Sequence, residues 1–300
     1  MNHSEIMPSQ KSGTVGPVPI LHQERTEVFR REAQRIKLVF RFTTPPCSVS
    51  HATLKINPWC VSHTPCPFLF FLLFSFSLMA QKPVLHSTKA GLSYLKHSPK
   101  TASAKSPVLI LLHGVGSNEE DLFSLAGQLP DNLMVLSVRA PYTLGQDSYS
   151  WYPVDFSSGK PVYDAAVAEK SRLQLVQLIE EIKRTEPVDP KQVYLGGFSQ
   201  GGIMSYSVGL TRPELLKGIV VLSGRLLDEV KTRTAPKEKL KPLRVFISHG
   251  TQDPMIAVVQ ARNALSFVTS LGLKPYYREY PAVHTITQDM ITDLLNWLKS

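Results

Sequence analysis

The feature that most constrains the fold is a regular alternation of strand and helix patterns, which begins near residue 84 and continues to residue 298. Residues 106–112 form a continuous apolar run, typical of a strand covered on both faces. Further strands are predicted at 90–96, 134–138, 192–196, 218–222, 243–248 and 276–280, and helices at 118–128, 163–184, 201–210, 258–271 and 286–298. This alternation predicts one α/β domain over residues 84–300, with a mostly parallel central sheet flanked by helices on both faces.

The residues before this domain lack such a pattern. Residues 1–66 mix Pro, Ser, Thr and His without a period of 2 or 3.6, so disorder is predicted. The apolar run 67–78 is about twelve residues long, and a spanning helix needs ~20. Either this run is an anchor or export segment behind an unusual leader, or the working protein begins at Met79 and residues 1–80 are a non-native extension. We favour the second interpretation, because the organised pattern begins only afterwards, and it implies a cytoplasmic protein.

The excess of positive charge does not indicate a nucleic-acid-binding protein. The net charge is +9, but residues 1–80 hold 8 basic and 4 acidic residues, which leaves 25 and 20 in residues 81–300. These basic residues are scattered rather than grouped on one face, so a solvated surface is expected. Membrane association is expected only through the apolar run 67–78.

The cysteines indicate a domain without disulfides. Cys47, Cys60 and Cys66 are the three cysteines of the chain, and all precede residue 81. The domain must therefore be stabilised by its core alone, which suits a reducing compartment. Cys60 and Cys66, even with His51 and His63 nearby, match no usual zinc spacing, so no metal site is predicted.

A serine lies at a sharp turn between a predicted strand and a predicted helix. Gly197-Phe-Ser-Gln-Gly201 is a G-x-S-x-G motif, and its position after strand 192–196 and before helix 201–210 is the context that this motif requires. A nucleophile at such a turn has strained backbone angles, and a side chain on either neighbouring glycine would clash. The motif lacks the Gly-Lys-Ser/Thr of a phosphate loop. Ser199 is therefore a candidate nucleophile, although a glycine-rich turn without chemistry remains the alternative for the motif alone.

Two further residues supply what a serine nucleophile needs. A serine hydroxyl reacts at neutral pH only when a base lies within hydrogen-bond reach and a carboxylate orients that base. Asp253 follows the predicted strand 243–248, and His284 follows the predicted strand 276–280. Both lie at carboxyl ends of strands, where a parallel sheet presents its active site. The sequence therefore predicts a catalytic triad of Ser199, Asp253 and His284.

Acyl transfer also requires donors to a developing oxyanion. The buried strand 106–112 leads into His113-Gly-Val-Gly-Ser117, where a glycine turn can present the backbone N–H of Val115. The N–H of Gln200, directly after the serine, is the second predicted donor. His113 and His249 are predicted to be structural histidines that hold loops or strand ends.

Several segments together resemble the phospholipase/carboxylesterase family of α/β-hydrolases, which includes the acyl-protein thioesterases. The resemblance covers about residues 90–300 and rests on Leu112-His-Gly-Val-Gly-Ser-Asn-Glu-Glu-Asp-Leu122, Arg139-Ala-Pro141, Ser150-Trp-Tyr152, Leu195-Gly-Gly-Phe-Ser-Gln-Gly-Gly202, Leu222-Ser-Gly224 and His249-Gly-Thr-Gln-Asp-Pro254. It implies the α/β-hydrolase fold, and the triad order Ser199, Asp253, His284 is the order of that fold. It also implies the same oxyanion donors, no metal or organic cofactor, and a place for Trp151 near the acyl-binding groove. A packing role for Trp151 is the alternative.

The expected function is hydrolysis of carboxylic esters or thioesters, of small molecules or lipids, through an acyl-enzyme intermediate. The alternative is a non-catalytic protein of the same fold that binds a ligand. One departure from the family pattern bears on activity: Val283 stands where glycine usually precedes the catalytic histidine, and a β-branched residue does not adopt a positive φ. The segment from Gly224 to Pro242 is expected to be a surface lid or a linker. The sequence is compatible with a monomer or a homodimer.

Overall fold

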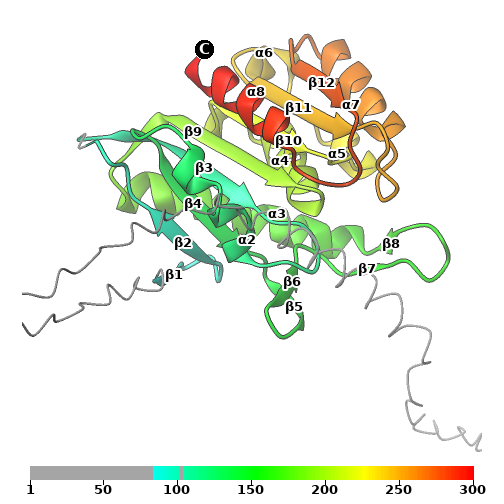
Figure 1. The fold of residues 1–300 in the computed structure, drawn as a ribbon, viewed down its shortest axis with the longest axis horizontal. Coiled ribbons are helices and arrows are strands. Elements are labelled where there is room, and N and C mark those ends of the chain that lie inside the picture. Colours follow the sequence, from blue (N-terminus) through cyan, green and yellow to red (C-terminus); the bar gives the residue numbers. More distant parts are fainter. Residues whose placement is uncertain (1–83, 102–103) are drawn as a thin grey trace, which may run out of the picture.

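The computed structural model describes residues 84–101 and 104–300 (Figure 1). The predictions for residues 1–80, including the apolar run 67–78 and the three cysteines, lie outside the described residues. Within the described ranges, no helix is both long and apolar enough to cross a membrane.

The described chain is built around a sheet of eight strands in the order β1-β2-β4-β3-β9-β10-β11-β12. Only β1 and β2 at one edge run antiparallel to their neighbours, and the other pairs are parallel. The mostly parallel sheet predicted from the alternating pattern is therefore confirmed. Its strands are β1 (Leu85–Ser87), β2 (Ser93–His97), β3 (Ser106–Leu112), β4 (Met134–Arg139), β9 (Val188–Phe198), β10 (Gly218–Leu222), β11 (Arg244–Gly250) and β12 (Tyr276–Tyr280).

Both faces of the sheet are covered, which explains why β3 is apolar along its length. Val108, Ile110 and Leu112 pack into one core cluster, whereas Leu109 and Leu111 pack into the other. Successive side chains of a strand point to opposite faces, so a strand between two helical layers is apolar at every position. The first cluster includes α3 (Ala165–Thr185), α4 (Gln200–Thr211) and α7 (Val259–Ser270), and the second includes α2 (Glu119–Phe123) and α8 (Gln288–Lys299) (Figure 1).

The single helix predicted over 118–128 is wrong in length. Helix α2 ends at Phe123, and a separate 3₁₀ turn follows at Ala126–Gln128. The hydroxyl of Ser124 donates to the carbonyl of Asp121 at 2.6 Å, so a side chain satisfies a backbone carbonyl at the helix end. Gly127 then disfavours any further helix.

The segment predicted as a lid or linker is a packed part of the domain. It forms α5 (Asp228–Thr232) and α6 (Lys237–Leu240), and Leu227, Val230 and Leu240 are buried in the first core cluster. Two hairpins that the sequence pattern did not reveal lie before α3. They are β5 (Tyr142–Gly145) with β6 (Ser148–Ser150), and β7 (Val154–Asp155) with β8 (Val162–Tyr163).

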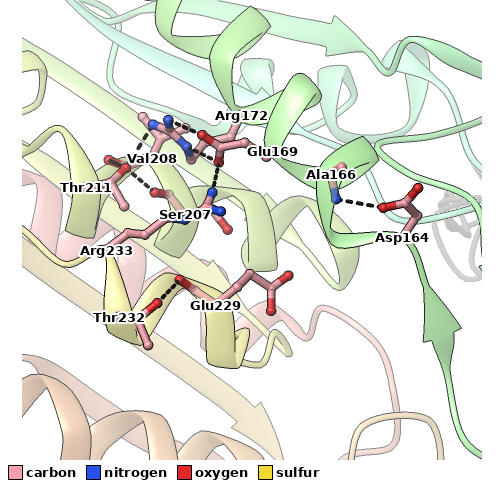
Figure 2. A network of polar contacts seen from close by, with 10 residues as sticks. All are labelled: Asp164, Ala166, Glu169, Arg172, Ser207, Val208, Thr211, Glu229, Thr232 and Arg233. Carbon is pink, nitrogen blue, oxygen red and sulfur yellow. Dashed lines mark hydrogen bonds and ion pairs between the residues drawn. The ribbon is translucent and has the colours of Figure 1, made fainter.

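A polar network ties α3 to α4 and to the end of α5 (Figure 2). Arg172 makes two hydrogen bonds of 2.7 Å with Glu169 and a third, at 3.0 Å, with the hydroxyl of Thr211 on α4. Arg233, just after α5, pairs with the same Glu169 carboxylate at 3.0 Å. This network fixes the helices that cover one face of the sheet, outside the site described next.

Candidate active site

Ser199 lies at the sharp turn between β9 and α4. Its φ is +54°, a strained conformation for a residue other than glycine, and its N–H is held by the carbonyl of Leu222 at 2.9 Å. The turn passes very close to the end of β3. A Cβ on Gly201 would lie 1.9 Å from the carbonyl oxygen of Leu112, and one on Gly197 would lie 2.5 Å from the same atom. Both flanking positions therefore require glycine, as the motif predicts.

The loops that carry Asp253 and His284 are joined by backbone hydrogen bonds. The N–H of Thr251 donates to Tyr280 at 2.8 Å, and the N–H of Gln252 donates to Ala282 at 3.0 Å. These bonds continue the pairing of β11 with β12 beyond the sheet. Because the two strands are parallel neighbours, their carboxyl-end loops bring the acid and the base to one place.

The structure brings the three predicted triad residues into hydrogen-bond reach of one another. His284 Nε2 lies 2.9 Å from Ser199 Oγ, and His284 Nδ1 lies 2.6 Å from Asp253 Oδ2. An ionised carboxylate only accepts, so Nδ1 carries the proton and Nε2 accepts from the serine hydroxyl. The ring of Phe198 lies 4.7 Å from the imidazole and packs against it. A serine in this arrangement can be deprotonated by the imidazole as it attacks.

Asp253 is held in its ionised form by several donors. Burial by itself would raise the pKa of its carboxyl, but hydrogen bonds from His249 and His284 outweigh it and leave the pKa well below its usual value. The N–H groups of Met255 and Ile256 donate to Oδ1 at 2.9 and 2.8 Å. A carboxylate fixed in this way can orient an imidazole and stabilise its protonated form.

His249 is a buried histidine that contacts Asp253 directly. Its Nε2 lies 2.6 Å from the carbonyl oxygen of Ile256 and 3.2 Å from Asp253 Oδ2. Both neighbours are acceptors, so Nε2 carries a proton. Among the described residues, its Nδ1 has no hydrogen-bond partner. The predicted role of a satisfied strand-end histidine is therefore incomplete, because His249 also helps to hold the carboxylate beside His284.

Backbone hydrogen bonds hold the loop 114–117 at Gly116 and Ser117. The N–H of Gly116 donates to the carbonyl of Tyr149 at 2.9 Å, and the N–H of Tyr149 donates to the carbonyl of Ser117 at 2.8 Å. Within the described part of the chain, the N–H of Val115 finds no acceptor in these contacts. The N–H of Gln200 lies in the first turn of α4, where helix geometry leaves N–H groups without intrahelical partners. Val115 and Gln200 remain the predicted oxyanion donors, and both residues line the same cavity as Ser199.

The side chain of His113 joins the loop 114–117 to the segment after β4. Its ring is fully buried, with Nδ1 2.7 Å from the carbonyl of Gly114, and Nε2 accepts from the N–H of Ala140 at 3.1 Å. Burial lowers the pKa of this imidazole, which keeps it neutral and matches one donor and one acceptor. The contacts fit the structural role predicted for His113.

Trp151 does not line the substrate cavity. Its side chain is 0% exposed, and its indole N–H donates to the carbonyl of His113 at 3.0 Å. The prediction that Trp151 contacts the substrate is not supported, because its indole packs against the loop that begins at His113. The next residue, Tyr152, lines the cavity instead. The sequence did not reveal that the Gln200 side chain bonds the N–H of Trp151 at 2.8 Å and the carbonyl of Tyr152 at 2.7 Å.

A cavity of about 960 Å³ opens over Ser199 and His284. Its wall is largely apolar on the side of Tyr152, Phe156 and Ile203, and it includes one arginine, Arg225. No pattern in the sequence singles out Arg225, although it directly follows the Leu222-Ser-Gly224 segment of the family resemblance. Within residues 84–101 and 104–300, no cluster of three or more metal-ligating side chains is present.

Val283 does not distort the loop that carries His284. Among the described residues, the non-glycine residues with positive φ are Asp147, Ser199 and Ser223, so Val283 has an ordinary backbone conformation. Its side chain is 51% exposed and borders the cavity. The histidine reaches Ser199 in spite of the missing glycine.

The mostly parallel sheet, with a serine at the sharp turn after β9, defines an α/β-hydrolase. Residues 98–300 match the phospholipase/carboxylesterase family, and the chain belongs to that family.

Similar proteins carry esterase and thioesterase names. The chain is 27% identical over 204 residues to Carboxylesterase SOBER1 of Arabidopsis thaliana, covering 64% of this chain and 89% of that one. It is 32% identical over 220 residues to Acyl-protein thioesterase 1 of Gibberella zeae, covering 66% of this chain and 92% of that one. The crystal structure of esterase PE8 superimposes with a TM-score of 0.58 at 26% identity, covering 72% of this chain and 98% of that one.

Proposed function

We propose that the protein is a serine hydrolase that cleaves carboxylic esters or thioesters through an acyl-enzyme intermediate. The observation that carries this proposal is the hydrogen-bonded series from Ser199 through His284 to Asp253 at the floor of a largely apolar cavity. The names of the similar proteins, carboxylesterases and acyl-protein thioesterases, support the same reaction class.

The mechanism follows from the positions of these groups. Ser199 Oγ attacks the acyl carbonyl while His284 Nε2 takes the hydroxyl proton, and the N–H groups of Val115 and Gln200 bind the oxyanion. Collapse of the tetrahedral intermediate expels the alcohol or thiol, which receives the proton from His284. Water then attacks the acyl-enzyme with His284 as base, and the carboxylic acid leaves as Ser199 regains its proton. Asp253 keeps the imidazole in the required tautomer throughout.

The test is covalent labelling by a fluorophosphonate probe, followed by hydrolysis of matched p-nitrophenyl esters and thioesters. Wild type should be labelled, Ser199→Ala should abolish labelling and lower hydrolysis about 10³-fold or more, and His284→Ala should sharply lower both. Ser87→Ala and His86→Ala, on the edge strand β1, are matched controls that should leave both unchanged.

Two results would contradict the proposal. Labelling that persists in Ser199→Ala would assign the reactive group elsewhere. A folded wild type that is neither labelled nor hydrolytic would favour a non-catalytic binding protein of the same fold.

We also propose a cytoplasmic location, with small-molecule or lipid acyl esters and thioesters as substrates. The absence of cysteine from residues 81–300 supports a reducing compartment. Under this proposal, any attachment to membranes depends on residues 67–78.

A further inference from the structure

Arg225 places a positive charge in an otherwise apolar part of the cavity wall. Of the described residues that line the cavity, Arg225 is the sole arginine or lysine, and Asp121 is the sole carboxylate. Asp121 already accepts a hydrogen bond from the hydroxyl of Ser117 at 2.7 Å. Arg225 is half-buried at this wall, and its positive charge has no use for a neutral acyl chain.

The guanidinium group contacts Tyr163 and lies in no direct ion pair with an acid among the described residues. It lies 5.4 Å from the centre of the Tyr163 ring, which in turn lies 5.1 Å from the ring of Tyr152 at the cavity wall. Tyr163 is itself fixed, since its hydroxyl donates to Glu229 at 3.0 Å. An arginine stacked on a ring keeps its edge N–H groups available for a planar anion.

Its charge lacks a carboxylate partner within the described part of the chain. Most other arginines in this part lie within 4.0 Å of an acid, among them Arg139, Arg172, Arg212, Arg233, Arg262 and Arg278. On α5, Asp228 attracts Arg225 electrostatically but pairs with Lys231 at 2.7 Å, and Glu229 contacts the Tyr163 hydroxyl. A guanidinium group has five N–H donors, so Arg225 keeps donors for a ligand beyond its contact with Tyr163.

We propose that Arg225 binds a carboxylate carried by the substrate, so that the enzyme prefers anionic esters or thioesters over neutral ones of equal length. The inference rests on the proposed function for its kinetic consequence, but the anion subsite itself does not require catalysis. The carboxylate belongs either to the acyl group, as in a half-ester of a dicarboxylic acid, or to the leaving group, as in an ester of a hydroxy acid. Arg225 would be a specificity-determining residue, not a catalytic one.

The kinetic test uses two matched substrate pairs. The acyl-side pair is mono-p-nitrophenyl adipate against p-nitrophenyl hexanoate, and the leaving-group pair is 6-(hexanoyloxy)hexanoate against hexyl hexanoate. Wild type should show a kcat/KM about 10-fold or more higher for the carboxylate member of one pair, and raising the ionic strength should reduce this preference. The pair that shows the preference identifies the source of the anion.

Variants then assign the preference to Arg225. Arg225→Gln should lower the preference ratio by about 10- to 100-fold, and Arg225→Lys should retain part of it. Arg233→Gln is the matched control, because Arg233 lies in the same segment but pairs with Glu169 outside the cavity (Figure 2), and it should leave the ratio unchanged.

A binding measurement separates this inference from the proposed function. Calorimetry with Ser199→Ala, which cannot form an acyl-enzyme, should show tighter binding of the carboxylate member of at least one of two pairs: monoethyl adipate against ethyl hexanoate, or 6-(hexanoyloxy)hexanoate against hexyl hexanoate. Equal binding within both pairs, or equal kcat/KM within both pairs, would overturn the inference while leaving the esterase in place. Anion-selective binding without any hydrolysis would retain the subsite and overturn the esterase instead.

Discussion

At the scale of single residues, Asp253 shows how hydrogen bonds keep a catalytic carboxylate ionised and fixed in position. Four donors converge on one carboxylate: the rings of His249 and His284 and the N–H groups of Met255 and Ile256. Each donor favours the ionised form, so the imidazole of His284 faces a fixed negative charge. The sequence identified Asp253 by its position after a strand, but position alone did not reveal the second histidine behind it.

Asp253 should also make the stability of the protein depend on pH. Its pKa in the folded protein lies below the value of about 4 expected in the unfolded chain, so its contribution is complete above that value and is lost as the pH falls. Asp253→Asn should therefore lower the free energy of unfolding by about 1–3 kcal/mol at pH 7, and by less at pH 3.5. Urea titrations of both proteins at the two pH values measure this difference.

The matched control is Asp131→Asn. Asp131 is exposed and pairs with Lys100 at 2.8 Å, and exposed ion pairs contribute little. A difference between wild type and Asp253→Asn that is equal at both pH values would contradict the assigned ionisation.

At the scale of secondary-structure elements, the contact between the end of β3 and the start of α4 determines where Ser199 lies. Gly201→Ala should destabilise the protein by about 3 kcal/mol, because its Cβ would enter the carbonyl of Leu112 and either the helix or the strand must move. Fluorophosphonate labelling should fall in the same variant. Thermal and urea unfolding measure the first effect, and the labelling rate measures the second.

Gly127→Ala is the control for this substitution. Nothing lies within 4 Å of a Cβ at Gly127, and its φ is not positive. Its stability should stay within about 0.5 kcal/mol of wild type, as expected for sites away from packing constraints. A Gly201→Ala protein as stable as Gly127→Ala would show that the turn tolerates a side chain.

Among the secondary-structure elements, some strands could be predicted from the sequence and the short hairpins could not. Strands β3, β10 and β12 have the bounds that the sequence predicted. Strands β3 and β10 are largely apolar because both of their faces are covered, whereas the edge strand β12 is rich in tyrosine. The hairpins before α3 were missed, since strands of two to four half-exposed residues leave no period to detect. The triad residues were selected by their positions after strands, whereas Arg225 and the Gln200 side chain act through contacts made by the folded chain.

At the scale of the whole molecule, the described domain contains its own core. The buried apolar clusters draw on residues 90–297. We therefore predict that a variant lacking residues 1–78 keeps the thermal midpoint and the labelling rate of the full chain. Differential scanning calorimetry and the fluorophosphonate assay measure these two properties.

Fractionation of the same two proteins tests the proposed location. If the full chain and the shortened variant both stay in the soluble fraction, residues 67–78 do not attach the protein to membranes. A full chain that sediments with membranes while the variant does not would contradict the cytoplasmic proposal. Loss of folding in the variant would contradict the boundary placed between the extension and the domain.

The reacting residues and the residues of the cavity wall lie on different elements, and this separation bears on how such enzymes diverge. Ser199, Asp253 and His284 follow β9, β11 and β12 of the large sheet, whereas the wall residues Tyr152 and Phe156 lie between the two hairpins and in the β7–β8 hairpin, and Arg225 lies in the loop between β10 and α5. Substitutions in the wall can change which molecules are accepted without displacing the groups that react. Selection can therefore act on substrate choice and on chemistry separately, and descendants of one ancestor can acquire new substrates while they inherit the same reaction.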